Sequence, residues 1–155
     1  MAEKRALSSA VVYRDPAAAL KWLEAAFSFE TTLLIEDADG NLAHAQMAWG
    51  DSLVMVGSEW TAEHKSPASI DGLMTQTVHI QLADGDGTVD AHCERARQAG
   101  AVIVAEPDMQ FYGDRTYRCK DPEGHIWTVS QTLLQIAPDQ WDTGDMGLKA
   151  TIYKA

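Results

Sequence analysis

The chain has 155 residues, of which 46% are hydrophobic and 23% charged, and its formal net charge is −11. These values are typical of one folded domain with a core, and they argue against a disordered chain and against two ordinary domains. An acidic chain lacks the basic patches that phosphate contacts need, so we expect no nucleic-acid partner. No run of about 18 apolar residues occurs and the start, MAEKRALSS, has no apolar signal core, so we expect no membrane partner.

Two cysteines, Cys93 and Cys119, lie far apart, without a CxxC motif or the spacing of a disulfide framework. Isolated thiols of this kind are typical of a reducing compartment. The sequence therefore predicts a cytoplasmic protein with reduced cysteines.

The first half of the chain begins with a strand signal followed by a helix signal. Asp15 and Pro16 precede an amphipathic run that ends near Phe27, and these residue types are common at the N-cap and first position of a helix. Asp39-Gly40 is a hairpin signal. Strands are predicted at 10–13, 29–36, 42–49 and 53–58.

A polar stretch, residues 59–74, is the predicted linker, and the pattern then repeats. Thr88 is a suitable N-cap for a helix that ends at Gly100. Strands are predicted at 77–83, 101–106, 115–120 and 126–132, with a loop at 107–113 and a turn, DPEGH, at 121–125. The order βαβββ, linker, βαβββ indicates an internal repeat. One half is too small to bury both faces of its sheet, so we expect the halves to pack together.

Four stretches resemble a known family: RDPAAALKWLEAAFSF, HAQMAWGDSLVMVGSE, VDAHCERARQAGAVIVAEP and FYGDRTYRCKDPEGHIWTV. Together the motifs cover residues 7–132. They resemble the vicinal-oxygen-chelate superfamily, which includes glyoxalase I, the fosfomycin and bleomycin resistance proteins and the extradiol dioxygenases. Within it, the chain is most similar to the glyoxalase-like group that contains bleomycin resistance proteins and PhnB-like proteins.

The resemblance implies an α+β fold in which two tandem βαβββ modules form a curled mixed sheet around a cleft. It implies a single domain over 1–155, with modules at 7–58 and 75–132, a linker at 59–74 and a C-terminal arm at 133–155. It also implies a homodimer, because members of the superfamily commonly dimerise.

Members of the superfamily that bind a divalent metal place one His or Glu on each of four strands. The resemblance carries these positions over to Ser8, Val54, Thr77 and Thr128. A hydroxyl is a poor ligand for such a metal and valine is none. We therefore expect no metal ligands and no metal cofactor.

Strand alternation indicates which side chains face the cleft. In TVHIQLA the apolar side chains pack under the helices, so His79 and its neighbours two residues away face the cleft. By the repeat offset, His44 corresponds to Arg118. The predicted ligand-binding residues are His44, Gln46, Thr77, Gln81, Thr116, Arg118 and Thr128, with Trp49 and Tyr112 near the mouth of the cleft.

His79 is the candidate catalytic residue, because it lies in mid-strand between apolar neighbours that favour a neutral imidazole base. The alternative is that His44 and His79 only line the pocket or form structural hydrogen bonds.

Several functions remain open. The first is a metal-independent binding protein of the bleomycin-resistance type, which holds a small, planar or cationic molecule in its cleft. The second is an enzyme on the same fold, either a metal-free isomerase or lyase that uses His79, or a divalent-metal glyoxalase or dioxygenase. A third is an interaction module without a ligand. The arm over 133–155 either covers the cleft, embraces a partner subunit or forms a surface tail.

Overall fold

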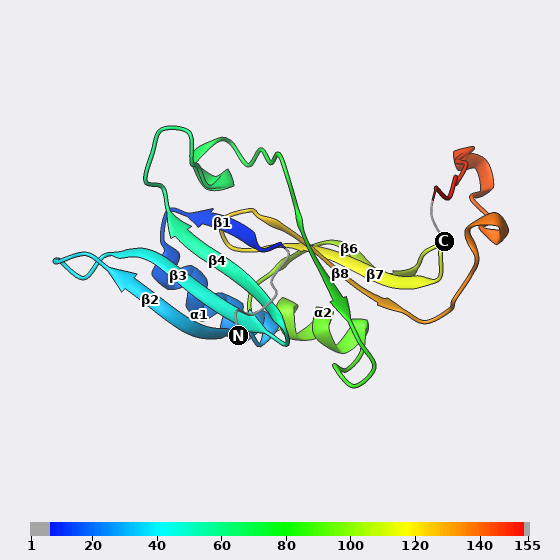
Figure 1. Ribbon diagram of the computed structural model, residues 1–155, viewed down its shortest axis with the longest axis horizontal. Helices are drawn as coiled ribbons and strands as arrows, with labels where there is room; N and C mark the ends of the chain where they lie inside the picture. The colour runs from blue at the N-terminus through cyan, green and yellow to red at the C-terminus, as the bar shows by residue number, and fades with distance from the viewer. Residues whose placement is uncertain (1–6, 154–155) are drawn as a thin grey trace.

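The computed structural model describes residues 7–153, and it contains two βαβββ modules side by side (Figure 1). The predicted α+β class and tandem modules are confirmed. The first module consists of β1 (Ser9–Tyr13), α1 (Pro16–Phe27), β2 (Glu30–Glu36), β3 (Leu42–Trp49) and β4 (Ser52–Ser58). The second consists of β5 (Val78–Leu82), α2 (Val89–Gln98), β6 (Val102–Met109), β7 (Asp114–Lys120) and β8 (Ile126–Thr132).

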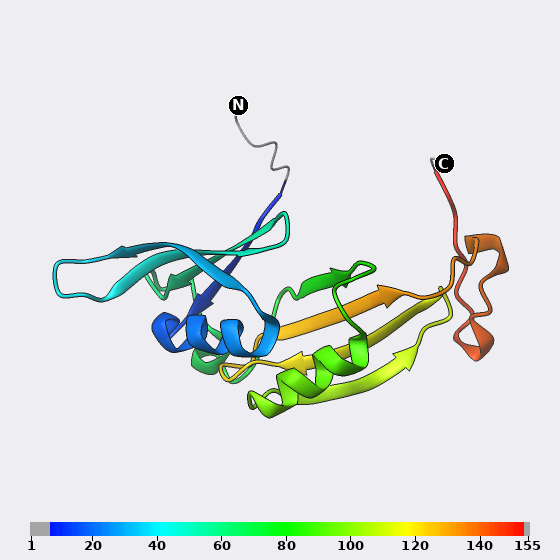
Figure 2. The same ribbon diagram turned by 90° about the horizontal axis from the view of Figure 1, so that it is seen from below.

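Each module forms its own four-stranded mixed sheet, with the orders β1-β4-β3-β2 and β5-β8-β7-β6. The pairs β1–β4 and β5–β8 are parallel, and the other neighbours are antiparallel. Helices α1 and α2 lie next to each other where the modules meet (Figure 2). Each sheet therefore has one face that packs on a helix and one face that points away from it.

Both helices begin at the predicted caps. The Asp15 carboxylate accepts a hydrogen bond from the Ala18 N–H at 3.0 Å, and the Thr88 hydroxyl accepts one from the Ala91 N–H at 3.2 Å. Gly100 follows α2 with a φ of +94°, a left-handed conformation that glycine adopts without a Cβ penalty. Local residue chemistry thus sets the helix boundaries. Neither helix of the described residues 7–153 is long and apolar enough to cross a membrane.

The hydrophobic core continues from one module into the other through aromatic rings. Trp127 of β8 is fully buried, and its ring centroid lies 5.1 Å from that of Phe27 and 5.8 Å from that of Phe29. Edge-to-face pairs of this kind add about 0.5–1.5 kcal/mol each beyond the area that they bury. The expectation that the two halves pack together is met by this shared core.

The region predicted as a loop at 107–113 is in part a strand. β6 continues through Pro107 to Met109, with irregular pairing between Ala105 and Asp108. β6 is the outer strand of its sheet, where proline need not donate to a neighbour, so Pro107 does not end the strand. The residue Pro107 alone does not indicate whether its strand is central or at the edge of a sheet, and so the sequence could not place it in a strand.

Side chains of the DPEGH turn, residues 121–125, form hydrogen bonds between the two modules. The buried carboxylate of Asp121 accepts hydrogen bonds from the Tyr13 hydroxyl at 2.7 Å and the Trp127 indole N–H at 3.1 Å. His125, also buried, donates from Nε2 to the backbone carbonyl of Val12 at 2.7 Å. Burial, followed by the Asp121 charge, raises the pKa of Tyr13, so its phenol stays a donor. His125 is therefore an inter-module contact and not simply a turn residue.

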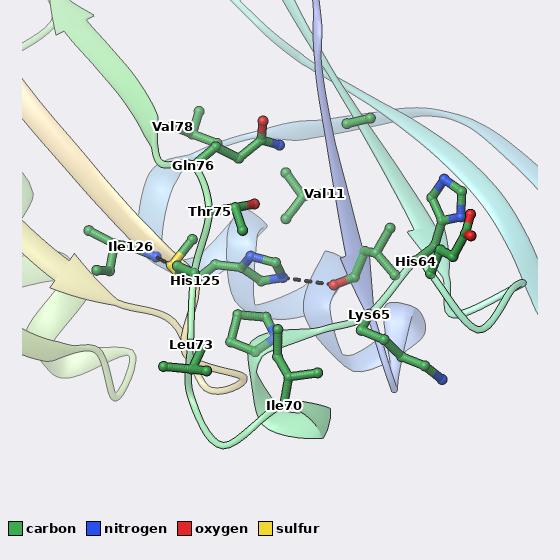
Figure 3. A pocket seen from close by; sticks show the side chains of 15 residues that line it. Val11, His64, Lys65, Ile70, Leu73, Thr75, Gln76, Val78, His125 and Ile126 are labelled. Atoms are coloured by element: carbon green, nitrogen blue, oxygen red, sulfur yellow. Dashed lines mark hydrogen bonds between the residues drawn. The ribbon is translucent and has the colours of Figure 1, made fainter.

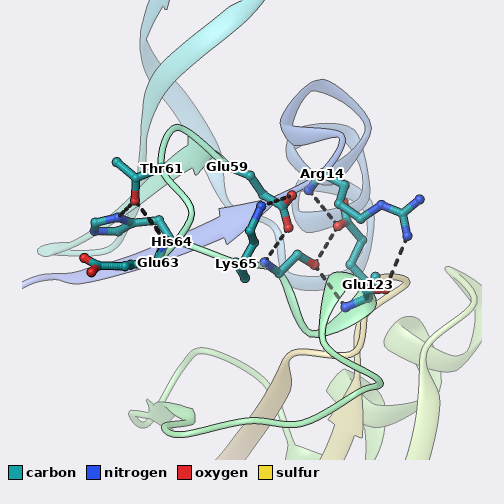
Figure 4. Close-up of polar contacts among 9 residues, drawn as sticks. Arg14, Glu59, Thr61, Glu63, His64, Lys65 and Glu123 are labelled. Carbon is teal, nitrogen blue, oxygen red and sulfur yellow. Dashed lines mark hydrogen bonds and ion pairs between the residues drawn. The ribbon is translucent and has the colours of Figure 1, made fainter.

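Glu123 extends this connection to the start of α1 (Figure 4). Its carboxylate accepts hydrogen bonds from the backbone N–H of Arg14 at 2.7 Å and of Asp15 at 3.0 Å. It also accepts one from the Ser66 hydroxyl at 2.7 Å. A carboxylate on N–H groups at the start of a helix is stabilising. The second module and the connecting segment thereby fix the position of the first.

The arm after β8 lies at the end of the molecule away from the first module (Figures 1 and 2). The backbone N–H groups of Leu133 and Leu134 donate to the Gly113 carbonyl at 3.1 and 3.0 Å. Trp141 packs on Phe111 and Tyr112, with ring centroids 5.7 and 6.1 Å apart. The described part of the arm, residues 133–153, therefore lies away from the junction of the two modules (Figure 2).

Candidate functional site

The face of the second sheet that points away from α2 is polar. Its other face gives Ile80, Tyr117 and Trp127 to the core, and side chains alternate between the faces along each strand. The side chains that point away from α2 come from β5, β7 and β8. We call them the polar face: His79, Gln81, Asp114, Thr116, Arg118, Thr128, Ser130 and Thr132.

Strand pairing arranges the polar face in rows. His79 lies opposite Thr128, and Thr128 lies opposite Arg118. Neighbouring strands are about 4.8 Å apart, so the two basic side chains flank Thr128 in one row about 10 Å wide. The next row is Gln81, Ser130 and Thr116. The structure thus brings together five of the side chains predicted to face the cleft: His79, Gln81, Thr116, Arg118 and Thr128.

Hydrogen bonds order this surface. His79 Nε2 lies 3.1 Å from Gln81 Oε1. The Gln81 amide nitrogen donates to Asp114 Oδ2 at 3.3 Å and to the Thr132 hydroxyl at 3.1 Å. The hydroxyls of Thr116 and Ser130 lie 2.8 Å apart and are both buried among their neighbours. His79 therefore belongs to a continuous chain of polar contacts that leads to a carboxylate.

Two arginines of β7 differ in their surroundings. Arg115 forms a two-pronged ion pair with Asp90 of α2, with both N–O distances at 2.7 Å, and this pairing lowers the pKa of the Asp90 carboxyl. Arg115 is thereby held within its own chain. Arg118 is exposed on the polar face, and its guanidinium forms no ion pair with any carboxylate in residues 7–153. It is available to a ligand.

A hollow of about 330 Å³ lies at the junction of the modules, beside the polar face. His79 and Gln81 line it from β5, and Trp49 and Leu53 line it from the first module. This volume lies at the lower end of the range for small-molecule sites, and the combination of apolar walls with a few polar groups is typical of them. Trp49 and His79 thus line the same hollow. We call this hollow the junction pocket.

The corresponding face of the first sheet is mostly apolar. His44 pairs with Gly57 and Gln46 with Met55, so both lie on the face away from α1, whose opposite side includes Ala45. The strand pairing shows that Gln46, and not His44, occupies the position in the first sheet that Arg118 occupies in the second. The constant repeat offset was wrong there, because the turns of the two modules differ in length. His44 and Gln46 lie on a different sheet from His79, and neither is among the described residues that line the junction pocket.

The same register corrects three of the four positions compared with metal ligands: Ala10, Met55 and His79 take the places predicted for Ser8, Val54 and Thr77. Val54 is buried against the helices, and the side chain that points away from them is Met55. The turn between the paired residues Trp49 and Ser52 has two residues and the turn between Lys120 and Ile126 has five, so a constant repeat offset does not align the two hairpins. Parallel pairing places Ala10 beside Met55 and His79 beside Thr128.

These corrected positions do not fit a divalent metal. They offer one imidazole, one hydroxyl, one thioether and one methyl group, whereas such a metal requires several imidazole or carboxylate ligands. In residues 7–153, no group of three or more His, Cys, Asp or Glu side chains is arranged to hold a metal ion.

The two remaining predicted site residues lie at the margins. Thr77 is exposed and directly precedes β5. Tyr112 lines a shallow hollow with Asp114 and Thr132, at the end of the polar face where the arm begins. The arm residue Trp141 packs on Tyr112, so this end of the face has an aromatic border.

A second cavity, of about 420 Å³, lies under the segment that connects the modules (Figure 3). Apolar side chains such as Ile70, Leu73 and Val78 form much of its wall, and His64 and Lys65 stand on one side. The ring of His125 reaches into it but is bonded to Val12. The sequence did not predict this cavity, because residues 59–74 show no periodic signal and their path depends on the modules that they join.

His92 of α2 is a half-buried histidine outside the polar face. Its Nδ1 lies 2.7 Å from the Tyr117 hydroxyl, its ring stacks on Phe27 at 5.3 Å, and its Nε2 has no hydrogen-bond partner in residues 7–153. Burial, followed by the charge of Arg95, lowers the pKa of His92 to about 4. His92 is therefore neutral near pH 7 and belongs to the packing between α2 and its sheet.

Comparison with known proteins agrees with this architecture. The family model described as Glyoxalase/Bleomycin resistance protein/Dioxygenase superfamily matches residues 6–129. The uncharacterized protein Rv0887c of Mycobacterium tuberculosis (strain ATCC 25618 / H37Rv) is 30% identical over 139 residues, which cover 87% of this chain and 79% of the relative.

Among solved structures, TioX from Micromonospora sp. ML1 is similar with a TM-score of 0.64 and 29% identity, over 82% of this chain and 98% of TioX. TnmS3, an antibiotic binding protein from Streptomyces sp. CB03234, has a TM-score of 0.63 and 20% identity, over 85% of this chain and 98% of TnmS3. At that identity the second likeness concerns the fold alone.

Proposed function

Since the chain belongs to the glyoxalase/bleomycin resistance protein/dioxygenase superfamily, we propose that it is a metal-independent protein that binds a small planar molecule at the polar face of its second module. The observation that carries this proposal is the polar face itself. An ordered set of hydroxyl, amide and imidazole groups borders a hollow with apolar walls, and the exposed Arg118 beside them has no ion-pair partner in residues 7–153.

The proposal of metal independence rests on the donor set. The cleft-facing positions of the four relevant strands are Ala10, Met55, His79 and Thr128. One imidazole without carboxylate partners does not hold a divalent ion against water.

A planar ligand is favoured by Trp49 in the wall of the junction pocket, because aromatic faces stack on flat molecules. A cation is not favoured there, since Arg118 lies on the polar face and the Asp114 carboxylate already accepts from Gln81. TnmS3, which shares the fold, is an antibiotic binding protein, and a ligand of that general kind is compatible with a hollow of this size.

We further propose that the working form is a homodimer. A single chain leaves the apolar side chains Leu33 and Ile35 of β2 and Val102 and Val104 of β6 at 41–60% exposure. Exposed apolar surface on the outer strands of both sheets is typical of a surface that meets a partner. A second copy would cover it and would enclose the polar face. Light scattering coupled to gel filtration should give twice the mass of the chain.

The proposal also places the protein in a reducing compartment, the cytoplasm. Cys93 and Cys119 are both buried free thiols, and burial raises the pKa of Cys119 to about 12. A protonated, buried thiol is unreactive and needs no disulfide partner.

A metal-free enzyme is the second candidate, and the contact of His79 with Gln81 favours it. An imidazole oriented by a second group is the usual arrangement of a general base. The substitution His79→Ala separates the two functions, since loss of a turnover with retention of ligand binding indicates the enzyme.

The main test is a thermal-shift screen of planar small molecules on protein whose metal content has been measured. A ligand at about 100 times its dissociation constant should stabilise the fold by about 2.7 kcal/mol. The shift should persist in EDTA. Stoichiometric bound metal, or shifts that vanish with EDTA, would contradict metal independence, and the absence of any stabilising compound would contradict small-molecule binding.

A further inference from the structure

The hydrogen bonds around Gln81 determine which nitrogen of His79 carries the proton. Asp114 is a carboxylate and can only accept, so the Gln81 group that faces it, at 3.3 Å, is the NH2. The Gln81 carbonyl oxygen then faces His79, and a carbonyl also only accepts. The nitrogen of His79 at 3.1 Å from it, Nε2, must therefore carry a hydrogen in the neutral ring.

The other ring nitrogen is consequently an acceptor. In the neutral Nε2–H tautomer, Nδ1 has a lone pair and no hydrogen. No side chain or backbone group of residues 7–153 donates to His79 Nδ1, and the side chain is exposed at the junction pocket. A ligand in that pocket therefore meets a fixed hydrogen-bond acceptor at His79 Nδ1. If the Gln81 amide could rotate freely, Nδ1 could be either an acceptor or a donor.

We infer that Asp114 and Gln81 are positioning residues that hold His79 as the Nε2–H tautomer, so that Nδ1 accepts a hydrogen bond from the hydroxyl of a planar hydroxyaromatic ligand. This inference rests on the proposed function for the existence of a ligand, but the tautomer is a property of the free protein.

The remaining surroundings agree with a hydroxyl on a flat ring system. Trp49 and Leu53 supply apolar walls on the side of the pocket that belongs to the first module. Arg118 stands in the same row of the sheet as His79, with Thr128 between them. The plane of the ligand ring is favoured beside the indole of Trp49.

The first measurement is the pair of ring ¹⁵N chemical shifts of His79 in the free protein, taken at the high-pH plateau of its titration. His79→Asn identifies the signals. We expect the shifts of a single Nε2–H tautomer, and in Gln81→Met, which keeps the shape of the side chain without the acceptor, both shifts should move toward a tautomeric average. Gln46→Met on the first sheet is the matched control and should leave the His79 signals in place.

An Nδ1–H tautomer in the native protein, or shifts that are identical in the native and Gln81→Met proteins, would overturn the assignment of the positioning residues. This outcome does not depend on any ligand.

The second measurement compares 7-hydroxycoumarin with 7-methoxycoumarin, in which a methyl group replaces the hydroxyl hydrogen and so removes the donor. The hydroxyl compound should bind about three- to tenfold more tightly, as expected for one hydrogen bond, and His79→Leu should remove the difference. Equal affinities, a preference that survives in His79→Leu, or binding of neither probe would overturn the ligand class. If compounds without a hydroxyl donor stabilise the protein in the wider screen, the ligand class is wrong while small-molecule binding stands.

Discussion

β1 and β5 occupy equivalent places in the two modules, each parallel to the last strand of its sheet, and their burial alternates in the same way. On the helix side both present apolar side chains, Val11 and Tyr13 in one and Ile80 and Leu82 in the other. Their opposite sides differ, because Ala10 of β1 stands where β5 has His79.

The same contrast holds in the neighbouring strand, where Met55 corresponds to Thr128. Packing against a helix restricts one face of each sheet to apolar residues, whereas the other face is not restricted by its own module. The first module thus supplies apolar surface and the second supplies hydrogen-bonding groups. A ligand with a flat apolar body and one polar end would use both.

The largest expected effect comes from breaking the contact between the modules. Asp121→Ala should lower the free energy of unfolding by about 3 kcal/mol or more, because the buried donors of Tyr13 and Trp127 lose their acceptor. Urea denaturation measures the change. Asp37→Ala, in an exposed turn, is the control and should cost about 1 kcal/mol or less. Equal losses in the two variants would show that the modules do not depend on this contact.

A second expected effect concerns His92 of α2. The other helix, α1, contains no histidine. The lowered pKa of about 4 means that the unfolded chain, with a histidine pKa near 6.5, binds more protons than the folded one between these values. The corresponding stability is present above about pH 6.5 and is lost as the pH falls to about 4, by roughly 3 kcal/mol.

His92→Gln should flatten this part of the stability profile, and chemical denaturation at several pH values measures it. The exposed carboxyl of Asp90, whose pKa is lowered by Arg115, contributes in the same direction in both proteins. Parallel pH profiles for the native and variant proteins would contradict the assignment to His92.

A third test addresses the two sheet faces directly. Once a ligand is in hand, Arg118→Gln should weaken its binding about tenfold, as expected for loss of a charged hydrogen-bonding group. Gln46→Ala changes the corresponding position of the first module and should have a smaller effect. Isothermal titration measures both. The variant Arg97→Gln controls for the loss of a positive charge. Arg97 lies on α2 and forms an exposed ion pair with Glu106. If Gln46→Ala were the more harmful, the first module would carry the polar recognition.

The smallest expected effect is that of Glu123→Gln. The amide keeps the shape of the side chain but weakens the charge-assisted hydrogen bonds to Arg14, Asp15 and Ser66, so we expect a loss of about 1 kcal/mol. Thermal or urea denaturation measures it. Glu63→Gln in the connecting segment should be neutral within about 0.5 kcal/mol, and a comparable loss there would point to a general effect of charge.

Sequence patterns predicted both helices, the repeat and the alternation of side chains along β5. The Asp15 and Thr88 caps, the Gly100 terminator and the alternation around His79 are short-range features, and they depend on chemistry that neighbouring residues carry with them. For the same reason, the alternation in β5 predicts that His79 points away from the helices.

Which residues of different strands are neighbours depends on the tertiary structure and could not be read from the sequence. The β3–β4 and β7–β8 turns differ in length, and strand pairing places Met55, not Val54, on the face away from the helix. A shift of one residue exchanges the faces of a strand, and the repeat offset cannot reveal it. The acceptor at His79 Nδ1 likewise depends on Asp114, which lies 33 residues from Gln81 in the chain and reaches it only across the folded sheet.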